Sequence, residues 1–392
     1  MKFLHTADWQ IGKPFAGIRD DRKRSLVQHA RVETIKRIGH VARDAGAELI
    51  LVAGDLFDSS SADKSTVSAA CSAIGQLGLP VFAIPGNHDH GGPGSVWEQE
   101  FFRREQASLA PNLIVLLEPV PRECDSAVLL PCPLLRRSVS IDPMEWLRVP
   151  DVYTRLSPDK PRIVLAHGST QVFSGQWEDD EEEDAAAPNL LDLSRLPESE
   201  IDYIALGDWH GTKQVHPKAW FAGTPELDRF AKGGDHDPGN VLVVEVRRGS
   251  QLKVVKEGTT GLRWNDLTFD LADDTALDEF QDRIDLLLGQ RANEDLLWLT
   301  LTGSVGIEAA SLLDKILESV DARLLRLKLT NKTRIAPTEA EIDALTRRTS
   351  DPLIASVARQ LVERSKAEDD DAHVARIALR ELHAACMEEA GS

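Results

Sequence analysis

Polar residues of metal-ligand type recur where apolar, strand-like runs end. They stand in the segments TADWQ, GDLFD, GNHDH, AHGS and GDWHG, and they are Asp8, Gln10, Asp55, Asn87, His167, Asp208 and His210. Oxygen and imidazole donors without thiolates suit Mn²⁺, Mg²⁺, Fe²⁺ or Zn²⁺ rather than a thiolate structural zinc. Each segment alone is typical of a turn or of a buried histidine. Because sites in open α/β sheets form beyond the carboxyl ends of strands, their recurrence predicts a metal centre.

The elements that must position these residues alternate in type. Strand-like runs are expected over residues 2–7, 48–53, 80–84, 113–117, 127–130, 162–166 and 201–206. Helix-like segments over residues 24–45 and 64–77 separate the first three runs. This β-α-β-α-β pattern predicts a layered α/β core. Glycines before Asp55, Asn87 and Asp208 permit the tight turns that aim a ligand back over a sheet.

The pattern changes after about residue 260, and no Pro/Gly-rich linker marks the change. A strand over residues 267–270, a helix over 273–289 and a strand over 296–302 begin a second unit, and further helices follow. We therefore expect a catalytic domain over residues 1–260 and a C-terminal domain over 261–392, helix-rich at its end.

The composition is that of a soluble globular protein. The chain has 392 residues, of which 42% are hydrophobic and 28% charged, and this length suits two domains. No stretch approaches the roughly 18 apolar residues of a membrane span, and the early Asp8 is unlike a secretory signal. The four cysteines form no CxxC pair, so we expect a reduced, cytoplasmic protein.

The charge balance is acidic. A net charge of −19 argues against a broad nucleic-acid footprint, because phosphate binding depends mainly on Lys and Arg. It leaves room for a local basic groove beside a metal cluster. The acidic run Glu178 to Asp184 (EDDEEED) is typical of a solvated loop, and the alternative is a flap that competes with nucleic acid for the site.

The motifs resemble those of a known superfamily. D-x-(H), GD-x-x-D, GNHD, H-G and G-(H)-x-H, in this order, are similar to the signature of the calcineurin-like metallophosphoesterases. The segments HTADWQIGK, AGDLFDS, IPGNHD and GTPELDRF resemble the DNA-repair nuclease branch, the SbcD-type exonuclease subunits. The resemblance covers residues 5–230 and is weaker beyond them. It implies a four-layer α/β fold, with two central β-sheets flanked by helices, and a smaller C-terminal α/β capping domain.

The resemblance also implies two divalent metal ions about 3.5–4 Å apart, bridged by Asp55. The remaining ligands would be Asp8, Gln10 and His210 for the first ion, and Asn87, His167 and Asp208 for the second. His88 would be the catalytic histidine, which contacts the phosphate and protonates the leaving oxygen. Asp58 and Asp89 are candidates to orient the ligands, or they cap turns.

Two positions depart from the family pattern, because Gln10 and Asp208 stand where the family has histidines. Both side chains still offer oxygen, which is harder than imidazole and favours Mn²⁺ or Mg²⁺ over Zn²⁺. Asp208 also raises the number of ligand carboxylates from two (Asp8 and Asp55) to three, so the cluster is less positive by one unit. Alternatively, Gln10 leaves a position open for water.

These observations favour a manganese-dependent DNA endonuclease or exonuclease in repair, acting on single-stranded or looped DNA. Among the basic residues that could contact DNA are Arg136, Arg137 and Lys213. The alternatives are a phosphodiesterase for small cyclic nucleotides and an inactive binding scaffold.

The resemblance implies partners as well as DNA. A homodimer through residues 24–45 is expected, with an SMC-like ATPase or with repair helicases and ligases as further partners. No membrane partner is expected.

Overall fold

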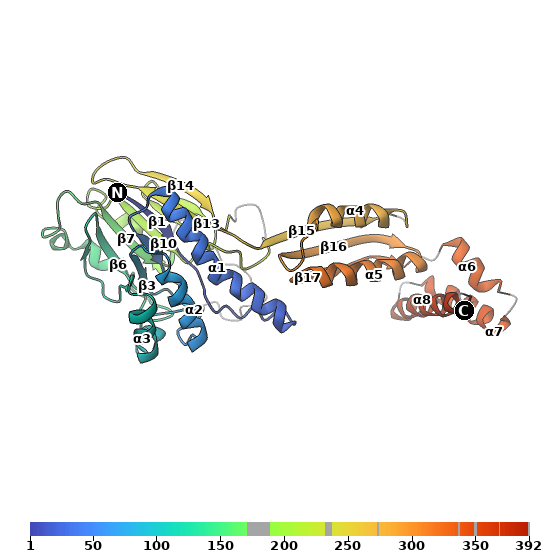
Figure 1. The fold of residues 1–392 in the computed structure, drawn as a ribbon. Coiled ribbons are helices and arrows are strands. Elements are labelled where there is room, and N and C mark those ends of the chain that lie inside the picture. The colour runs from blue at the N-terminus through green and yellow to red at the C-terminus, as the bar shows by residue number, and fades with distance from the viewer. Residues whose placement is uncertain are drawn as a thin grey trace. The chain divides into compact units, whose positions relative to one another are not determined.

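The computed structural model describes residues 1–170, 189–231, 237–272, 274–335, 338–348, 351–367 and 369–390. The chain divides into two compact units, Met1–Leu262 and Arg263–Ser392 (Figure 1). The division that we expected from the sequence lay after residue 260. Glu178 to Asp184, the acidic run, lie outside the described residues.

A six-stranded sheet that carries the first three ligand loops forms one half of the core of the first unit. Its strands, in spatial order, are β14 (Lys253–Gly258), β13 (Asn240–Glu245), β1 (Lys2–Thr6), β2 (Ile50–Ala53), β3 (Val81–Ile84) and β4 (Leu113–Val115). β1 to β4 are parallel, and β13 pairs antiparallel with β1. The carboxyl ends of β1, β2 and β3 therefore meet at one edge.

A second six-stranded sheet carries the remaining ligand loops. Its strands, in spatial order, are β11 (Lys213–His216), β12 (Ala219–Phe221), β10 (Tyr203–Gly207), β7 (Arg162–His167), β6 (Val128–Cys132) and β5 (Arg122–Glu123). β6, β7, β10 and β12 are parallel. A short pair, β8 (Ser169–Thr170) and β9 (Leu190–Leu191), follows β7.

The two sheets pack face to face because their strands are apolar on both sides. Phe3 and Leu51 of the first sheet share one buried cluster with Leu165 and Tyr203 of the second. Since neighbouring side chains of a strand point to opposite faces, the alternate residues of the first sheet, such as Leu4, pack on helices instead. Parallel sheets buried on both faces are typically covered in this way.

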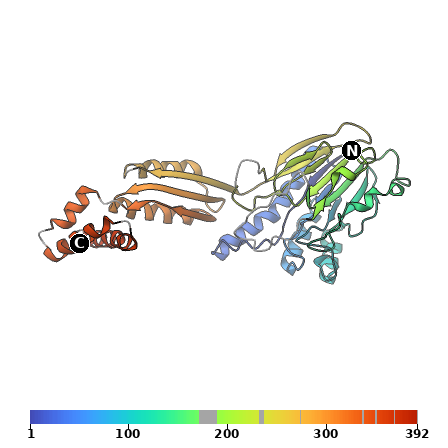
Figure 2. The same ribbon diagram turned by 180° about the vertical axis from the view of Figure 1, so that it is seen from behind.

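Three helices cover the outer face of the first sheet: α1 (Asp21–Ala45), α2 (Lys64–Gly75) and α3 (Glu100–Leu109). Figures 1 and 2 show them along one side of the double sheet. α1 begins after Asp20, whose side chain accepts a hydrogen bond from the Lys23 N–H, and ends at Gly46 with φ of 66°. The outer face of the second sheet packs on loops with 3-10 turns, among them Glu145–Arg148.

The second unit is a smaller α/β structure. β15 (Arg263–Leu271), β16 (Asp295–Val305) and β17 (Arg326–Asn331) are parallel, and β18 (Arg334–Ile335) pairs with β16. α4 (Ala276–Leu288) and α5 (Ile307–Arg323) pack on this sheet through residues such as Phe280 and Leu313. The unit continues with α6 (Glu339–Thr346), α7 (Pro352–Ser365) and α8 (Asp370–Ala390).

The predicted fold class is confirmed: the protein is α/β, with sheets flanked by helices. α3 was not predicted. Among the described residues, no helix has the length and the apolar character needed to cross a membrane.

Candidate metal centre

Four of the predicted ligand residues have an unusual backbone conformation. φ is 53° at Asp8, 41° at Gln10, 52° at Asp55 and 101° at Asp208. Positive φ in residues other than glycine costs on the order of 1–3 kcal/mol and is found mainly where function requires it. Each of these residues follows a strand directly or closely, and the left-handed turn reverses the chain beyond the sheet edge.

Backbone hydrogen bonds hold the loops after β1 and β2 side by side. The Asp8 N–H donates to Gly54 O (3.1 Å), and the Gln10 N–H donates to Asp55 O (2.8 Å). Gly54 has φ of 95°, and a Cβ there would lie 2.1 Å from His167 Nδ1. A Cβ at Gly86 would likewise lie 2.1 Å from Asp55 Oδ1. The glycines before Asp55 and Asn87 therefore make room for ligand side chains as well as for turns.

Oxygen ligands from three loops converge on His167. Its Nδ1 donates to Ala53 O (2.9 Å), which fixes the direction of Nε2. Nε2 lies 3.1 Å from Asn87 Oδ1, 3.5 Å from Asp55 Oδ2 and 3.7 Å from Asp208 Oδ1. The structure thus brings together all four residues predicted to hold the second ion.

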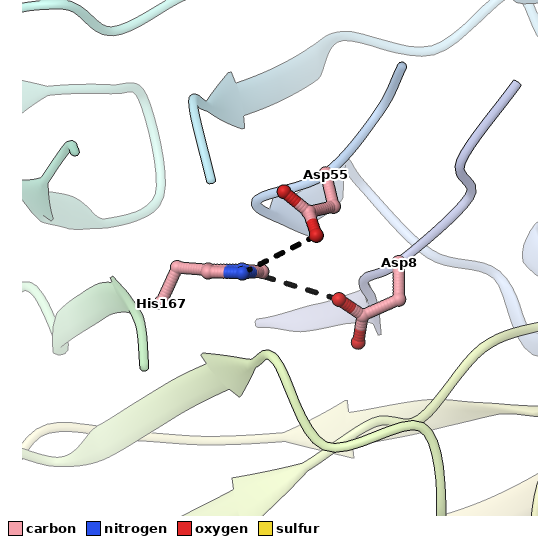
Figure 3. A group of neighbouring side chains, drawn as sticks. All are labelled: Asp8, Asp55 and His167. Atoms are coloured by element: carbon pink, nitrogen blue, oxygen red, sulfur yellow. Dashed lines mark ion pairs between the residues drawn. The ribbon is translucent and has the colours of Figure 1, made fainter. Parts of the chain in front are cut away.

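Asp8 joins this group from the first strand. Figure 3 shows Asp8, Asp55 and His167 pointing toward one another, with the ring of His167 facing both carboxylates. Their ligand atoms all lie within 4.8 Å of one another, and the three residues are buried. Asp8 Oδ1 also accepts a hydrogen bond from the Asp208 N–H (3.1 Å), which joins the β1 loop to the β10 loop.

The buried carboxylates of this cluster favour the binding of a cation. Burial raises the pKa of Asp8 well above its usual value, although the nearby His167 opposes the shift. Burial would lower the pKa of His167, but Asp55, Asp8 and Asp208 outweigh it and hold that pKa well above its usual value. Buried carboxylates at this separation are stable only when paired, protonated or bound to a metal. The donor set therefore fits a divalent ion.

The residues predicted to complete the first ion's site make different contacts. Gln10 Oε1 accepts a hydrogen bond from Lys13 Nζ (3.0 Å), and His210 Nδ1 donates to Asp228 Oδ2 (2.9 Å). Lys13 Nζ also pairs with Asp228 Oδ2 (3.2 Å). Burial lowers the pKa of His210 to about 4, so the imidazole is neutral and Nε2 keeps a lone pair for a metal.

Two contributors to the site were missed by the sequence reasoning. Asp228 is buried and orients His210, and its only sequence signal was the segment GTPELDRF. Arg31 is buried in α1, where Nη2 donates to Asp8 O (3.1 Å) and Nε donates to Trp9 O (2.8 Å). Arg31 therefore fixes the Asp8 turn, and no local sequence pattern predicted this role.

His88 lies beside the cluster with one ring nitrogen already engaged. Its Nδ1 donates to Asp58 O (3.0 Å), and its backbone N–H donates to Asp55 Oδ1 (3.0 Å). The side chain is 25% exposed, so Nε2–H can reach a substrate. Burial alone would lower the pKa of His88, but Asp55 and Asp58 raise it above its usual value. The imidazolium form of a general acid is thereby favoured.

Asp89 joins two of the ligand loops. Its Oδ2 accepts from the Phe57 N–H (3.0 Å), and its Oδ1 accepts from the Gly86 N–H (2.7 Å). These bonds connect the turn that carries Asp55 to the turn that carries Asn87. Asp89 therefore supports the ligands through their backbone.

The candidate DNA contacts differ in their relation to the site. Arg136 and Arg137 are exposed, and their loop is tied to the strand end that carries His167. Asn189 Nδ2 donates to Arg137 O (3.1 Å), and Asn189 O accepts from the Ser169 N–H (3.0 Å), just after His167. Lys213 is half-buried on β11.

A double-sheet α/β fold that gathers carboxylate, amide and imidazole side chains at its strand ends suits a metal-dependent phosphoesterase. Comparison with known families agrees, since a model of the family described as calcineurin-like phosphoesterase matches residues 1–212. The chain therefore belongs to the calcineurin-like phosphoesterase family.

Solved structures with detectable similarity include the protein TT1561 of Thermus thermophilus. It is 14% identical with a TM-score of 0.39, and the match covers 66% of this chain and 98% of that one. A second crystal structure is 12% identical with a TM-score of 0.40, and it is covered to the same extents, 66% and 98%.

Proposed function

We propose that the chain is a manganese-dependent nuclease that hydrolyses DNA phosphodiester bonds in repair, as an endonuclease, an exonuclease or both. The observation that carries the proposal is the convergence of Asn87, Asp55 and Asp208 oxygens on His167 Nε2, at 3.1 to 3.7 Å, with His88 beside them. The oxygen-rich donor set favours Mn²⁺ over Zn²⁺.

The residues that would hold the ions are Asp8, Gln10, Asp55, Asn87, His167, Asp208 and His210. When bound, the divalent ions neutralise the phosphate oxygens and lower the pKa of an attacking water. Asp89 and Asp228 keep the ligand loops and the His210 imidazole in position. The strained turns at Asp8 and Asp55 hold both carboxylates in place before any ion arrives.

His88 supplies the proton that the leaving group needs. The attacking water loses a proton to the solvent as its oxygen bonds to phosphorus, the phosphorus–oxygen ester bond breaks, and the Nε2 proton of His88 passes to the departing oxygen; the imidazole then regains a proton from the solvent. Asp58 O accepts from Nδ1–H and keeps the ring in the orientation that presents Nε2–H. Such a general acid contributes about 10²- to 10⁴-fold in rate.

Arg136 and Arg137 favour a polynucleotide over a small cyclic nucleotide. Both residues are exposed and lie on a loop joined to the His167 loop through Asn189. Positive charge outside the metal centre is useful to a substrate with further phosphates. Because the chain carries a net charge of −19, we expect weak affinity for rigid duplex and better cutting of single-stranded or looped DNA.

The test is hydrolysis by purified protein with Mn²⁺ or Zn²⁺ on single-stranded, hairpin and blunt duplex DNA, with cyclic nucleotides in parallel. We expect cutting with Mn²⁺, little with Zn²⁺, and faster cutting of single strands and hairpin loops. Faster turnover of cyclic nucleotides than of DNA would replace the nuclease assignment. If the protein binds Mn²⁺ but hydrolyses no phosphodiester, the result would support the alternative of an inactive binding scaffold. A homodimer and an SMC-like ATPase, helicase or ligase partner stay predictions of the resemblance.

A further inference from the structure

Lys13 brings a positive charge into the ligand set of the first ion. Its Nζ donates to Gln10 Oε1 (3.0 Å) and pairs with Asp228 Oδ2 (3.2 Å), the carboxylate that orients His210. The Lys13 side chain is only 15% exposed. The ammonium therefore lies between a predicted metal ligand and the support of another.

Hydrogen bonds of the backbone at Lys13 hold this residue in the position from which its side chain contacts Gln10 and Asp228. The Lys13 N–H donates to Gln10 O (3.1 Å), and Lys13 O accepts from Gln28 Nε2 (3.1 Å), which belongs to α1. The Lys13 ammonium also affects Asp58, the residue whose backbone oxygen accepts from His88. Burial raises the pKa of Asp58, and among the opposing charges on this carboxyl, the Lys13 ammonium is the strongest.

The charge balance of the site gives this lysine a role. Asp208 adds one carboxylate relative to a centre with histidine at that position, and a more negative centre attracts a phosphodiester less strongly. Lys13 Nζ and Arg229 Nη2 both pair with Asp228 Oδ2, at 3.2 Å and 3.3 Å, so these three side chains together add one positive charge beside the predicted ligands without another metal ligand.

We propose that Lys13 is a built-in cation of the metal centre that offsets part of the negative charge of its carboxylates, moderates metal affinity and strengthens the binding of phosphate. The inference rests on the proposed phosphoesterase function. Its signature is a pair of opposite effects, because a lysine repels a divalent ion and attracts a phosphate. A lysine that only stabilised the fold would weaken both kinds of binding when removed.

The experiment uses the full chain with Lys13→Met, Lys13→Gln and Lys13→Arg. Lys36→Met is the matched control, because Lys36 lies on the exposed side of α1 and pairs with Glu33. Calorimetry measures Mn²⁺ affinity without substrate, and then the affinity of the Mn²⁺-loaded protein for inorganic phosphate. We expect both neutral variants to bind Mn²⁺ roughly fivefold or more tightly and phosphate more weakly by a similar factor. Lys13→Arg and the control should match the wild type.

A second arm tests the compensation directly. Lys13→Met combined with Asp208→His removes the positive and the negative charge together, so both affinities should return toward those of the wild type. Unchanged or weaker Mn²⁺ binding in both neutral variants would overturn the inference, whether or not the protein cuts DNA. A wild-type protein that binds no divalent ion would overturn this inference and the proposed function together. Normal ion and phosphate responses without DNA cleavage would refute the nuclease assignment alone.

Discussion

His88→Ala should slow hydrolysis of DNA far more than hydrolysis of bis(p-nitrophenyl) phosphate. The alkoxide that leaves from DNA needs a proton, whereas p-nitrophenolate leaves as a stable anion. In the proposed mechanism His88 is the donor, since Nδ1–H is held by Asp58 O (3.0 Å), which leaves Nε2–H for the substrate. The comparison of the two substrates therefore isolates proton donation from every other contribution to the rate.

The size of the effect follows from the state of the imidazole. Asp55 and Asp58 outweigh burial and raise the pKa of His88 above its usual value, which favours the imidazolium form. A general acid in this state contributes about 10²- to 10⁴-fold, or about 3–5 kcal/mol of transition-state free energy. We expect a loss of this size on DNA and of less than about tenfold on the activated ester.

The variant should keep its metals. The His88 contact with Asp55 Oδ1 (3.0 Å) comes from the backbone N–H, which alanine retains. The assay therefore measures Mn²⁺ content beside kcat for both substrates. In the wild type, kcat on DNA should fall as pH rises through the raised pKa of His88, because the protonated ring is the donor. This decrease of kcat with rising pH should be absent from His88→Ala.

Equal losses on the two substrates, with Mn²⁺ content unchanged, would refute the role of His88 as a general acid. Loss of Mn²⁺ from the variant would instead show that His88 supports the ligands. His88→Gln is a useful second variant, since it retains a hydrogen-bond donor without acid–base chemistry. It should resemble the alanine variant on DNA.

Further predictions concern groups around the centre. Asp228→Asn should weaken Mn²⁺ binding about 10- to 100-fold by calorimetry, because His210 loses its charged partner; unchanged affinity would contradict this. Burial lowers the pKa of His5 from 6.5 to about 3. Between pH 8 and pH 5 only the unfolded chain protonates this histidine, so the free energy of unfolding should fall by about 2 kcal/mol over this range. Urea titrations at several pH values should show that the unfolding free energy of His5→Gln depends less on pH than that of the wild type, and an identical pH dependence would contradict the prediction. Asn189→Ala frees the Arg137 loop and should raise KM for single-stranded DNA severalfold with kcat nearly unchanged, as steady-state kinetics would reveal; a fall in kcat alone would argue for a different role.

The sequence pattern was informative about residues that follow strands. The positions of Asp55, Asn87, His167 and Asp208 after strands predicted a shared metal centre, and the family resemblance assigned these four residues to one ion. Their side chains do converge at His167 Nε2. The prediction was possible because parallel strands place their carboxyl ends at a common edge, so a polar residue after each strand has few other places to go. Strand runs were recognisable because most of their residues are apolar.

Contacts between distant segments were not predictable in this way. Lys13 was one basic residue among many in the sequence, and its contact with Asp228 depends on how the loop after β12 returns to the first sheet. Arg31 had the appearance of an ordinary helical arginine until the fold placed it under the Asp8 turn. α3 (Glu100–Leu109) was not expected either, because its ten residues make a weak periodic signal.

Sequence alone determined the alternation of strands and helices in the first part of the chain and the chemical types of the candidate ligands, since periodicity and turn residues are local properties of the chain. The tertiary structure decided which ligands share a donor cluster and which are engaged elsewhere. Gln10 illustrates the difference. The sequence left open whether its oxygen binds a metal or leaves that position to water, and the contact of this oxygen with the Lys13 ammonium (3.0 Å) depends on a backbone held by α1. Charge balance in a buried site is a property of the packed neighbours, and a linear pattern does not contain it.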